Sequence, residues 1–152
     1  MKKIIKLFLT LFNIGYLPLM PGTWASIAAC GFYYLCRDFT FYYSSFSIIL
    51  VVGGFFLCNH ADLFFSEKDP KPVVIDEFSA QLLCFVFIPF SISNLIIGFA
   101  LFRVLDILKF PPVVKRAENL PKGAGIMMDD VLCAVTVNIV LHIKFFLERL
   151  VA

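Results

Sequence analysis

The charged residues of this chain are confined to a few places, and this distribution restricts the fold more than any other feature. No Asp, Glu, Lys or Arg occurs between Lys6 and Arg37, between Asp38 and Asp62, between Glu77 and Arg103, or within 131–143. Long apolar runs are typical of helices at membrane depth, because about 20 apolar residues in a helix cross the hydrocarbon core. We therefore expect a protein that lies in or against a lipid bilayer.

The composition agrees with this expectation and argues against other classes. Of the 152 residues, 61% are hydrophobic and only 16% are charged, whereas a soluble domain has about 25% charged residues. So apolar a chain is not intrinsically disordered. The net charge is only +2, and without a stripe of Lys and Arg no nucleic-acid partner is expected. The five cysteines include no C-x-x-C pair, so neither a zinc site nor a disulfide framework is predicted.

Interruptions in the apolar runs predict an all-α fold: a compact bundle of about five to six helices, several of them at membrane depth. The segment 41–58 is just long enough to cross a bilayer. The segment 82–102 contains Pro89 and a polar stretch at 91–94, which indicates two short helices or one kinked helix. Broken or re-entrant helices are tolerated at this depth only where protein covers them. The length of the chain favours a single domain, 1–152, and the sequence gives no oligomeric state.

Two acidic pairs, Asp76-Glu77 and Asp129-Asp130, stand directly before apolar segments. One such pair could simply interact with the N–H groups at a helix start. Two pairs are harder to explain in this way, because neighbouring carboxylates repel one another and lose hydration. A hard divalent cation such as Mg²⁺ relieves both costs and prefers oxygen ligands. We therefore regard all four acids as candidate metal ligands, with helix capping as the alternative.

A third charged group, Arg103, Asp106 and Lys109, recurs every three residues and so shares one helix face. Solvated ion pairs would be the simplest interpretation of such a stripe. Together with the acidic pairs, however, these residues suggest a metal-assisted phosphoryl-transfer site. The two glycines at 123 and 125 permit a sharp turn or a close approach just before Asp129.

Three stretches of the chain resemble the phosphatidylglycerophosphatase A family. They are Pro-Gly-Thr-Trp-Ala-Ser at 21–26, Asp-Glu-Phe-Ser-Ala at 76–80, and the block at 102–109 that is continued by Gly-Ile-Met-Met-Asp-Asp at 125–130. The resemblance implies a membrane-bound, Mg²⁺-dependent phosphoric monoester hydrolase. Such an enzyme converts phosphatidylglycerophosphate to phosphatidylglycerol and inorganic phosphate, within glycerophospholipid synthesis. The chain departs from the family pattern at Ala25, Ala80 and Ala134, where glycine is usual, and at Lys122, which adds a charge beside the acidic block.

On this resemblance each candidate residue receives a role. Asp76, Glu77, Asp129 and Asp130 would hold one or two Mg²⁺ ions, while Asp106 would ligate a metal or orient water. Arg103 and Lys109 would clamp the phosphate, because arginine binds phosphate oxygens bidentately. Thr23, Ser26 and Lys122 are the candidate substrate-binding residues. Whether water or an aspartate attacks the phosphorus stays open at this point.

The Lys-rich start of the chain, Lys2, Lys3 and Lys6, favours a cytoplasmic N-terminus. We expect a multi-pass or re-entrant protein of the cell inner membrane, with the active site facing the cytoplasm. Two other functions are compatible with the same acidic pairs. One is a small membrane transporter, in which acidic residues mark an ion pathway. The other is a catalytically silent membrane subunit, in which they only cap helices.

Overall fold

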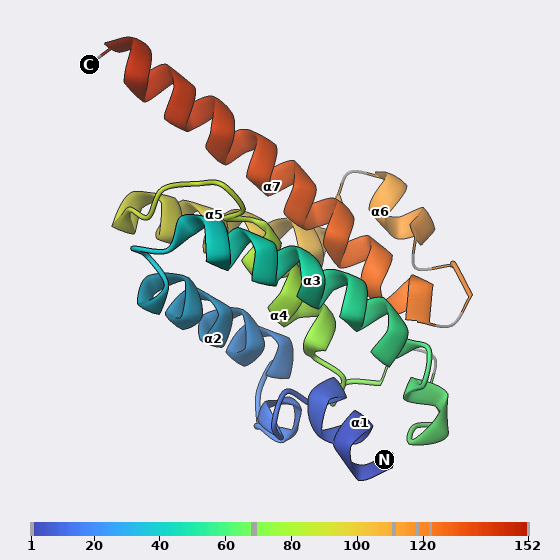
Figure 1. Ribbon diagram of the computed structural model, residues 1–152. Helices are drawn as coiled ribbons and strands as arrows, with labels where there is room; N and C mark the ends of the chain where they lie inside the picture. Colours follow the sequence, from blue (N-terminus) through green and yellow to red (C-terminus); the bar gives the residue numbers. More distant parts are fainter. Residues whose placement is uncertain (1, 68–69, 111, 118, 122, 152) are drawn as a thin grey trace.

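The computed structural model describes residues 2–67, 70–110, 112–117, 119–121 and 123–151, and in these ranges every regular element is helical. Figure 1 shows the arrangement. The elements are α1 (Lys2–Leu9), η1 (Ile14–Tyr16), α2 (Pro21–Leu35), α3 (Thr40–Cys58), η2 (Ala61–Leu63), α4 (Ile75–Leu83), α5 (Ile92–Leu108), α6 (Pro112–Ala117) and α7 (Gly123–Val151). The all-α expectation is confirmed, and the count of seven α-helices includes the short α1 and α6.

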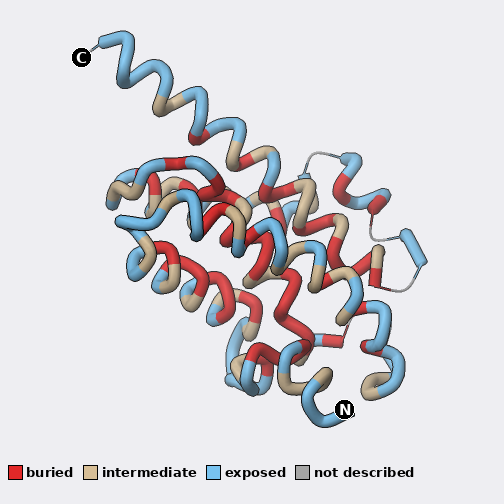
Figure 2. Tube along the Cα trace, in the orientation of Figure 1, coloured by how far each residue is buried: buried red, intermediate tan, exposed pale blue. Residues whose placement is uncertain are grey.

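The short helix α4 lies at the centre of the bundle, where it packs against α2, α3 and α7. Its residues from Ser79 to Leu82 are almost completely buried, as the red segment at the middle of Figure 2 shows. Three alanines at these helix contacts, Ala25, Ala80 and Ala134, have no exposed surface. Small side chains let helix backbones approach closely, so these three alanines lie in tight contacts between helices.

The chain breaks between α4 and α5, as Pro89 predicted, and buried side chains bind the carbonyl groups of this irregular segment. The hydroxyl of Tyr43 donates to the carbonyl of Leu82 (2.7 Å), and the amide of Asn138 donates to the carbonyls of Cys84 and Val86 (both 3.0 Å). Because unpaired backbone groups are costly in apolar surroundings, these contacts allow a non-helical segment to lie inside the bundle.

Two helices of the described chain, α3 and α7, are long and apolar enough to cross a membrane. Only 33% of the residues in the apolar stretch of α3 and 28% of those in α7 are buried, whereas the core helix of a soluble protein would be mostly covered. Large side chains such as Ile49 and Phe56 on α3 and Ile143 and Phe146 on α7 are exposed. These outward apolar faces point to a membrane location.

The start of α7 differs from the sequence expectation. The helix begins at Gly123, so Asp129 and Asp130 lie in its second turn, not at its head, and Gly123 and Gly125 are helical residues. The close approach that these glycines permit is present nonetheless. The N–H of Gly123 donates to the side chain of Asn59 (3.2 Å), and a Cβ at this position would overlap the backbone of Cys58. The glycine therefore lets the start of α7 meet the end of α3.

Candidate metal-binding and phosphate-binding site

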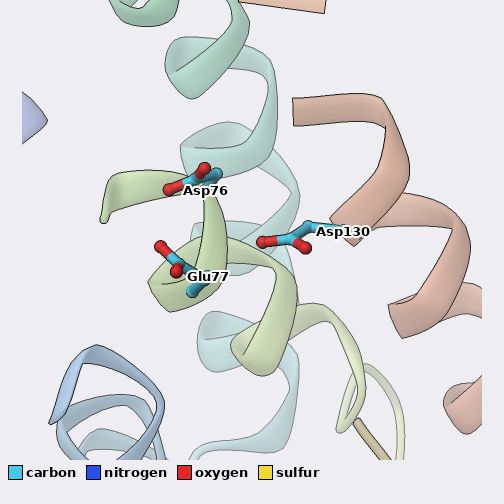
Figure 3. Close-up of side chains that lie close together, drawn as sticks. All are labelled: Asp76, Glu77 and Asp130. Carbon is cyan, nitrogen blue, oxygen red and sulfur yellow. The ribbon is translucent and has the colours of Figure 1, made fainter. Parts of the chain in front are cut away.

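Three carboxylates converge between α4 and α7. Asp76 and Glu77 come from the first turn of α4, and Asp130 comes from the second turn of α7. Each offers one oxygen, and these three oxygens lie within 4.8 Å of one another. Figure 3 shows Asp130 reaching toward the α4 turn that carries the other two. Below we refer to Asp76, Glu77 and Asp130 as the acid triad.

The acid triad lacks a neutralising side chain within ion-pair distance among the described residues. Asp76 Oδ1 and Glu77 Oε2 are buried and accept no hydrogen bond. Burial raises the pKa of Asp76 well above its usual range, and the charges of Glu77 and Asp130 add to this effect. Burial likewise raises the pKa of Glu77 to about 7. Three such groups require either protons or a bound cation, and carboxylate oxygens at this spacing suit a hard divalent metal.

A second cluster lies beside the acid triad and has a balanced charge. Arg103 Nη1 lies 3.0 Å from Asp106 Oδ2, and Lys109 Nζ donates to Asp106 Oδ1 (3.3 Å) and to Asp129 Oδ2 (2.6 Å). We refer to these four residues as the ion-pair chain. Burial alone would lower the pKa of Lys109, but the hydrogen bond and charge of Asp129 raise it above its ordinary value. Lys109 therefore stays charged throughout the physiological pH range.

The ion-pair chain owes its geometry to the end of α5. Arg103 and Asp106 are one turn apart on this helix, and Lys109 is its left-handed C-cap residue (φ 49°). This conformation ends the helix at Leu108, and the Lys109 ammonium contacts Asp129 on α7. The shared helix face that the sequence predicted is thus present for these three residues.

The four acids that the sequence identified as metal ligands separate into two groups. Three form the acid triad, whereas Asp129 points to Lys109. Its second oxygen, Asp129 Oδ1, is buried and accepts no hydrogen bond, so Asp129 keeps one oxygen available. The two consecutive aspartates differ because neighbouring residues on a helix point about 100° apart.

A pocket of about 400 Å³ opens beside both clusters. Its lining includes Met20, Pro21, Gly22, Lys71, Glu77 and Arg103. It joins one carboxylate of the acid triad to the guanidinium of the ion-pair chain, whose Nε atom is buried without a hydrogen-bond partner. A phosphate in this pocket would meet free N–H donors on one side and carboxylates on the other.

The N-terminal end of α2 borders this pocket, as the sequence anticipated for a phosphate site. Helix N-termini bind anions through free backbone N–H groups. The hydroxyls of Thr23 and Ser26 are buried and have no hydrogen-bond partner, and Ser26 has no exposed surface. The third predicted substrate-binding residue, Lys122, lies outside the described residues.

Sequence reasoning missed two residues of this site. Gly22 packs so closely on Glu77 that a Cβ would overlap the Glu77 carboxylate. Lys71 lines the pocket although it belongs to no acidic motif. For Gly22, the helix-starting Pro21-Gly22 was a signal of close approach. For Lys71, the only signal was its position between Pro70 and Pro72, five residues before Asp76.

Comparison with known proteins agrees with the geometry. The model of the family described as phosphatidylglycerophosphatase A matches residues 7–145. A relative from Escherichia coli (strain K12), named phosphatidylglycerophosphatase A, is 32% identical over 128 residues, which cover 82% of this chain and 73% of the relative. A relative of the same name from Haemophilus influenzae is 33% identical over 140 residues, covering 90% of this chain and 86% of the relative.

A third relative, from Bacteroides thetaiotaomicron, is 32% identical over 133 residues, covering 82% of each protein, and is provisionally named a phosphatidylinositol-3-phosphatase. No solved structure matches the chain. The three names share one chemistry, the removal of a phosphate from a lipid headgroup, and differ in the headgroup.

Proposed function

This chain belongs to the phosphatidylglycerophosphatase A family and is a phosphoric monoester hydrolase, and on this premise we propose that its substrate is phosphatidylglycerophosphate. Hydrolysis releases the terminal phosphate as inorganic phosphate and leaves phosphatidylglycerol in the membrane. The reaction is then the last step in making this lipid within glycerophospholipid synthesis. The match over most of the chain supports this assignment.

The acid triad holds Mg²⁺ in this proposal, and Asp129 adds a ligand through Oδ1 where a second ion or a wider coordination shell requires it. The fit rests on three carboxylate oxygens that lie within 4.8 Å of one another, and on buried oxygens of Asp76 and Glu77 that accept no hydrogen bond. Oxygen-only ligands at the border of an apolar bundle favour Mg²⁺ over softer metals. When bound, the metal supplies positive charge to the phosphoryl oxygens.

The ion-pair chain binds and orients the phosphate. Arg103 donates its buried Nε–H, which has no hydrogen-bond partner, to a phosphate oxygen, while the ion pair with Asp106 keeps the guanidinium in place. Lys109 adds a second positive charge, and its two aspartates keep it in position. Asp106, held between both cations, orients the water that attacks the phosphorus.

The N-terminal end of α2 binds the remaining phosphate oxygens. Thr23 and Ser26 provide hydroxyl groups that have no other partner, and the helix dipole favours a negative charge at this end. Lys122 contributes to the same function in this proposal, on the basis of the sequence alone.

The site faces the cytoplasm in this proposal, in a protein that crosses the inner membrane several times. The N-terminal ends of α2, α4 and α7 and the C-terminal end of α5 all contribute to the site, so it lies at one side of the bilayer. The lysines of α1 belong to this side, because the N–H of Val74, just before α4, donates to the carbonyl of Leu9 (3.0 Å). Lysine-rich ends stay in the cytoplasm.

The segment from α4 to α5 enters and leaves on the same side in this topology. Helix α4 has only nine residues, about 14 Å of helix, so it does not cross alone. It descends from the site, the irregular segment turns within the bundle, and α5 returns to the site. The side chains that bind its carbonyl groups make such a re-entrant path tolerable.

The observation that carries the proposed function is the acid triad beside the buried Arg103 guanidinium, whose Nε has no hydrogen-bond partner. The direct test is release of inorganic phosphate from phosphatidylglycerophosphate by the purified protein in detergent, with Mg²⁺ and with EDTA. We expect release only with the divalent metal. A phosphoinositide monoester serves as the comparison substrate, because one relative's name points to that headgroup. No release from phosphatidylglycerophosphate with any divalent metal would contradict the proposal.

The silent-subunit alternative loses support from the position of the second acidic pair. A capping acid interacts with free N–H groups in the first helical turn, whereas the first turn of α7 contains no acidic residue. The Asp130→Asn variant distinguishes a phosphatase from a silent subunit. A phosphatase needs this carboxylate for phosphate release, whereas a silent subunit has no reaction that depends on it.

A further inference from the structure

One cation of the pocket has no function in the proposed chemistry. Lys71 lines the same pocket as Glu77 and Arg103 but belongs neither to the acid triad nor to the ion-pair chain. Within the described residues, no carboxylate lies within ion-pair distance of its ammonium group. By contrast, Arg103 and Lys109 are already engaged with Asp106. Lys71 therefore provides an uncompensated positive charge at the mouth of the site.

The backbone around Lys71 is held in a fixed position. Pro70 and Pro72 flank it, and proline restricts the backbone on both sides. The N–H of Val73 donates to the carbonyl of Pro70 (2.8 Å), which closes a turn around Lys71. The carbonyl of Pro72 also packs against Gly15, where a Cβ would overlap it. A rigid backbone lowers the entropic cost of ligand binding by the side chain.

The pocket has an apolar side as well as a charged one. Met20 lines it and is 57% exposed, and its neighbour Leu19 is 86% exposed. Both residues have left-handed backbone conformations (φ 48° and 59°), which non-glycine residues adopt only at a cost. This loop therefore presents the apolar side chain of Met20 to the pocket and that of Leu19 to the surroundings, where the acyl chains of a lipid would leave the site.

The chemistry of the proposed substrate fits a pocket with both charged and apolar lining residues. A phosphoglycerol headgroup carries a terminal phosphomonoester, which reacts, and a phosphodiester, which connects the glycerol to the acyl-bearing part. When the monoester lies against Arg103, the diester lies between the reacting phosphate and the acyl chains. Lys71 is the second cation of the pocket that Arg103 and Met20 also line, so it can meet the diester while Arg103 meets the monoester.

We propose that Lys71 binds the non-reacting phosphodiester and so selects lipids that carry two phosphates. This inference rests on the proposed function and deepens it, because it assigns the residue that reads the headgroup. A charge-assisted contact of this kind adds to substrate affinity without acting on the reacting phosphorus. Its loss should consequently appear in KM and not in kcat.

The test compares Lys71→Met and Lys71→Arg with the unchanged chain, with phosphatidylglycerophosphate in mixed detergent micelles and saturating Mg²⁺. We expect Lys71→Met to raise KM about tenfold, with kcat within about twofold, and Lys71→Arg to restore most of the affinity. Lys115→Met is the matched control, because it removes the charge of another exposed lysine. Its KM should stay that of the unchanged chain.

A competition measurement separates the diester from lipid phosphate in general. Phosphatidic acid, which has only one phosphate, should inhibit the unchanged chain and Lys71→Met at the same concentration. Weaker inhibition in Lys71→Met, an unchanged KM, or an equal KM increase in Lys115→Met would overturn the assignment of Lys71. If the unchanged chain itself fails to hydrolyse phosphatidylglycerophosphate, the proposed function fails and this inference fails with it.

Discussion

The acid triad and the ion-pair chain lie beside each other and contain similar residues, yet their charges are balanced in different ways. The ion-pair chain has two cations and two carboxylates, joined by contacts of 2.6 to 3.3 Å. The acid triad has three carboxylates, and two of its oxygens are buried without a partner. Both carboxylates of the first cluster have a cationic partner among the described residues, whereas the second cluster requires protons or a cation from outside. Acidic residues indicate a metal site only where the protein does not neutralise them itself.

The largest expected effect concerns the acid triad. We expect Asp130→Asn to lower kcat by at least about 10³-fold, because it removes a ligand from the centre that stabilises charge on the phosphoryl group. The metal-free variant should unfold at the same or a higher temperature than the unchanged chain, since one of three repelling charges is gone. Phosphate release and thermal unfolding in detergent measure the two effects.

Asp38→Asn is the control for this experiment, because Asp38 is exposed and lies at the opposite end of α2 from the site. It should keep full activity. Full activity in Asp130→Asn would instead remove the acid triad from the mechanism.

A substitution in the ion-pair chain should lower the stability of the protein, in contrast to Asp130→Asn. Lys109→Met leaves the buried Asp129 without the cation of the ion-pair chain and Asp106 with Arg103 alone, so we expect the free energy of unfolding to fall by about 3 kcal/mol. Adding Asp129→Asn to this variant should recover part of the loss, because the second change removes an unpaired charge. Chemical denaturation in detergent provides the measurement. Equal stabilities of Lys109→Met and Asp130→Asn would abolish the distinction between the clusters.

A smaller loss of activity is expected from a substitution in α2 that displaces one carboxylate of the acid triad. In Gly22→Ala the new methyl group displaces the Glu77 carboxylate, and we expect kcat to fall about 10- to 100-fold, as for other changes that shift a metal ligand. Gly31→Ala in the same helix is the matched control, because a Cβ there meets no atom within 4 Å. The control should be as active as the unchanged chain and slightly more stable, since alanine favours helix.

The mildest test varies pH without changing the sequence. The pKa of Glu77 is about 7 in the folded protein, above its ordinary value of 4.5, so the folded state holds a proton more tightly than the unfolded state does. The resulting stabilisation is complete below pH 4.5 and is lost as the pH rises through 7. We expect the metal-free protein to melt several degrees lower at pH 8 than at pH 5.

Mg²⁺ should reverse this dependence and raise the melting temperature more at pH 8, where it competes with fewer protons. Glu77→Gln should flatten the pH profile of the metal-free protein. A profile that stays unchanged in Glu77→Gln would show that the dependence arises outside the acid triad.

The features that could be predicted from the sequence are those encoded locally. The break at Pro89, the apolar helix near 41–58 and the position of Asp76 and Glu77 at a helix start all follow from neighbouring residues. The shared face of Arg103 and Asp106 likewise follows from helical periodicity.

The remaining features depend on packing between distant segments. No local pattern distinguishes Asp129, which contacts Lys109, from Asp130, which contacts the start of α4, because this depends on how α7 is rotated against its neighbours. The sequence predicts that this helix begins at Asp129, because two glycines usually indicate a turn. The helix instead begins at Gly123, where the glycine permits contact with α3. Lys71 enters the site only through the turn that precedes α4 and had no motif to reveal it.

Helix α7 also has a consequence for the lipid around the protein. Along this helix, Asp130 and Lys144 are 14 residues apart, which corresponds to about 21 Å at 1.5 Å per residue. The hydrocarbon core of a bilayer is about 30 Å thick, so polar groups on this helix are closer together than the two headgroup layers. Asp130 is buried inside the bundle, so protein and not lipid surrounds its carboxylate. The acid triad can therefore lie below the level of the headgroups without exposing its charges to acyl chains.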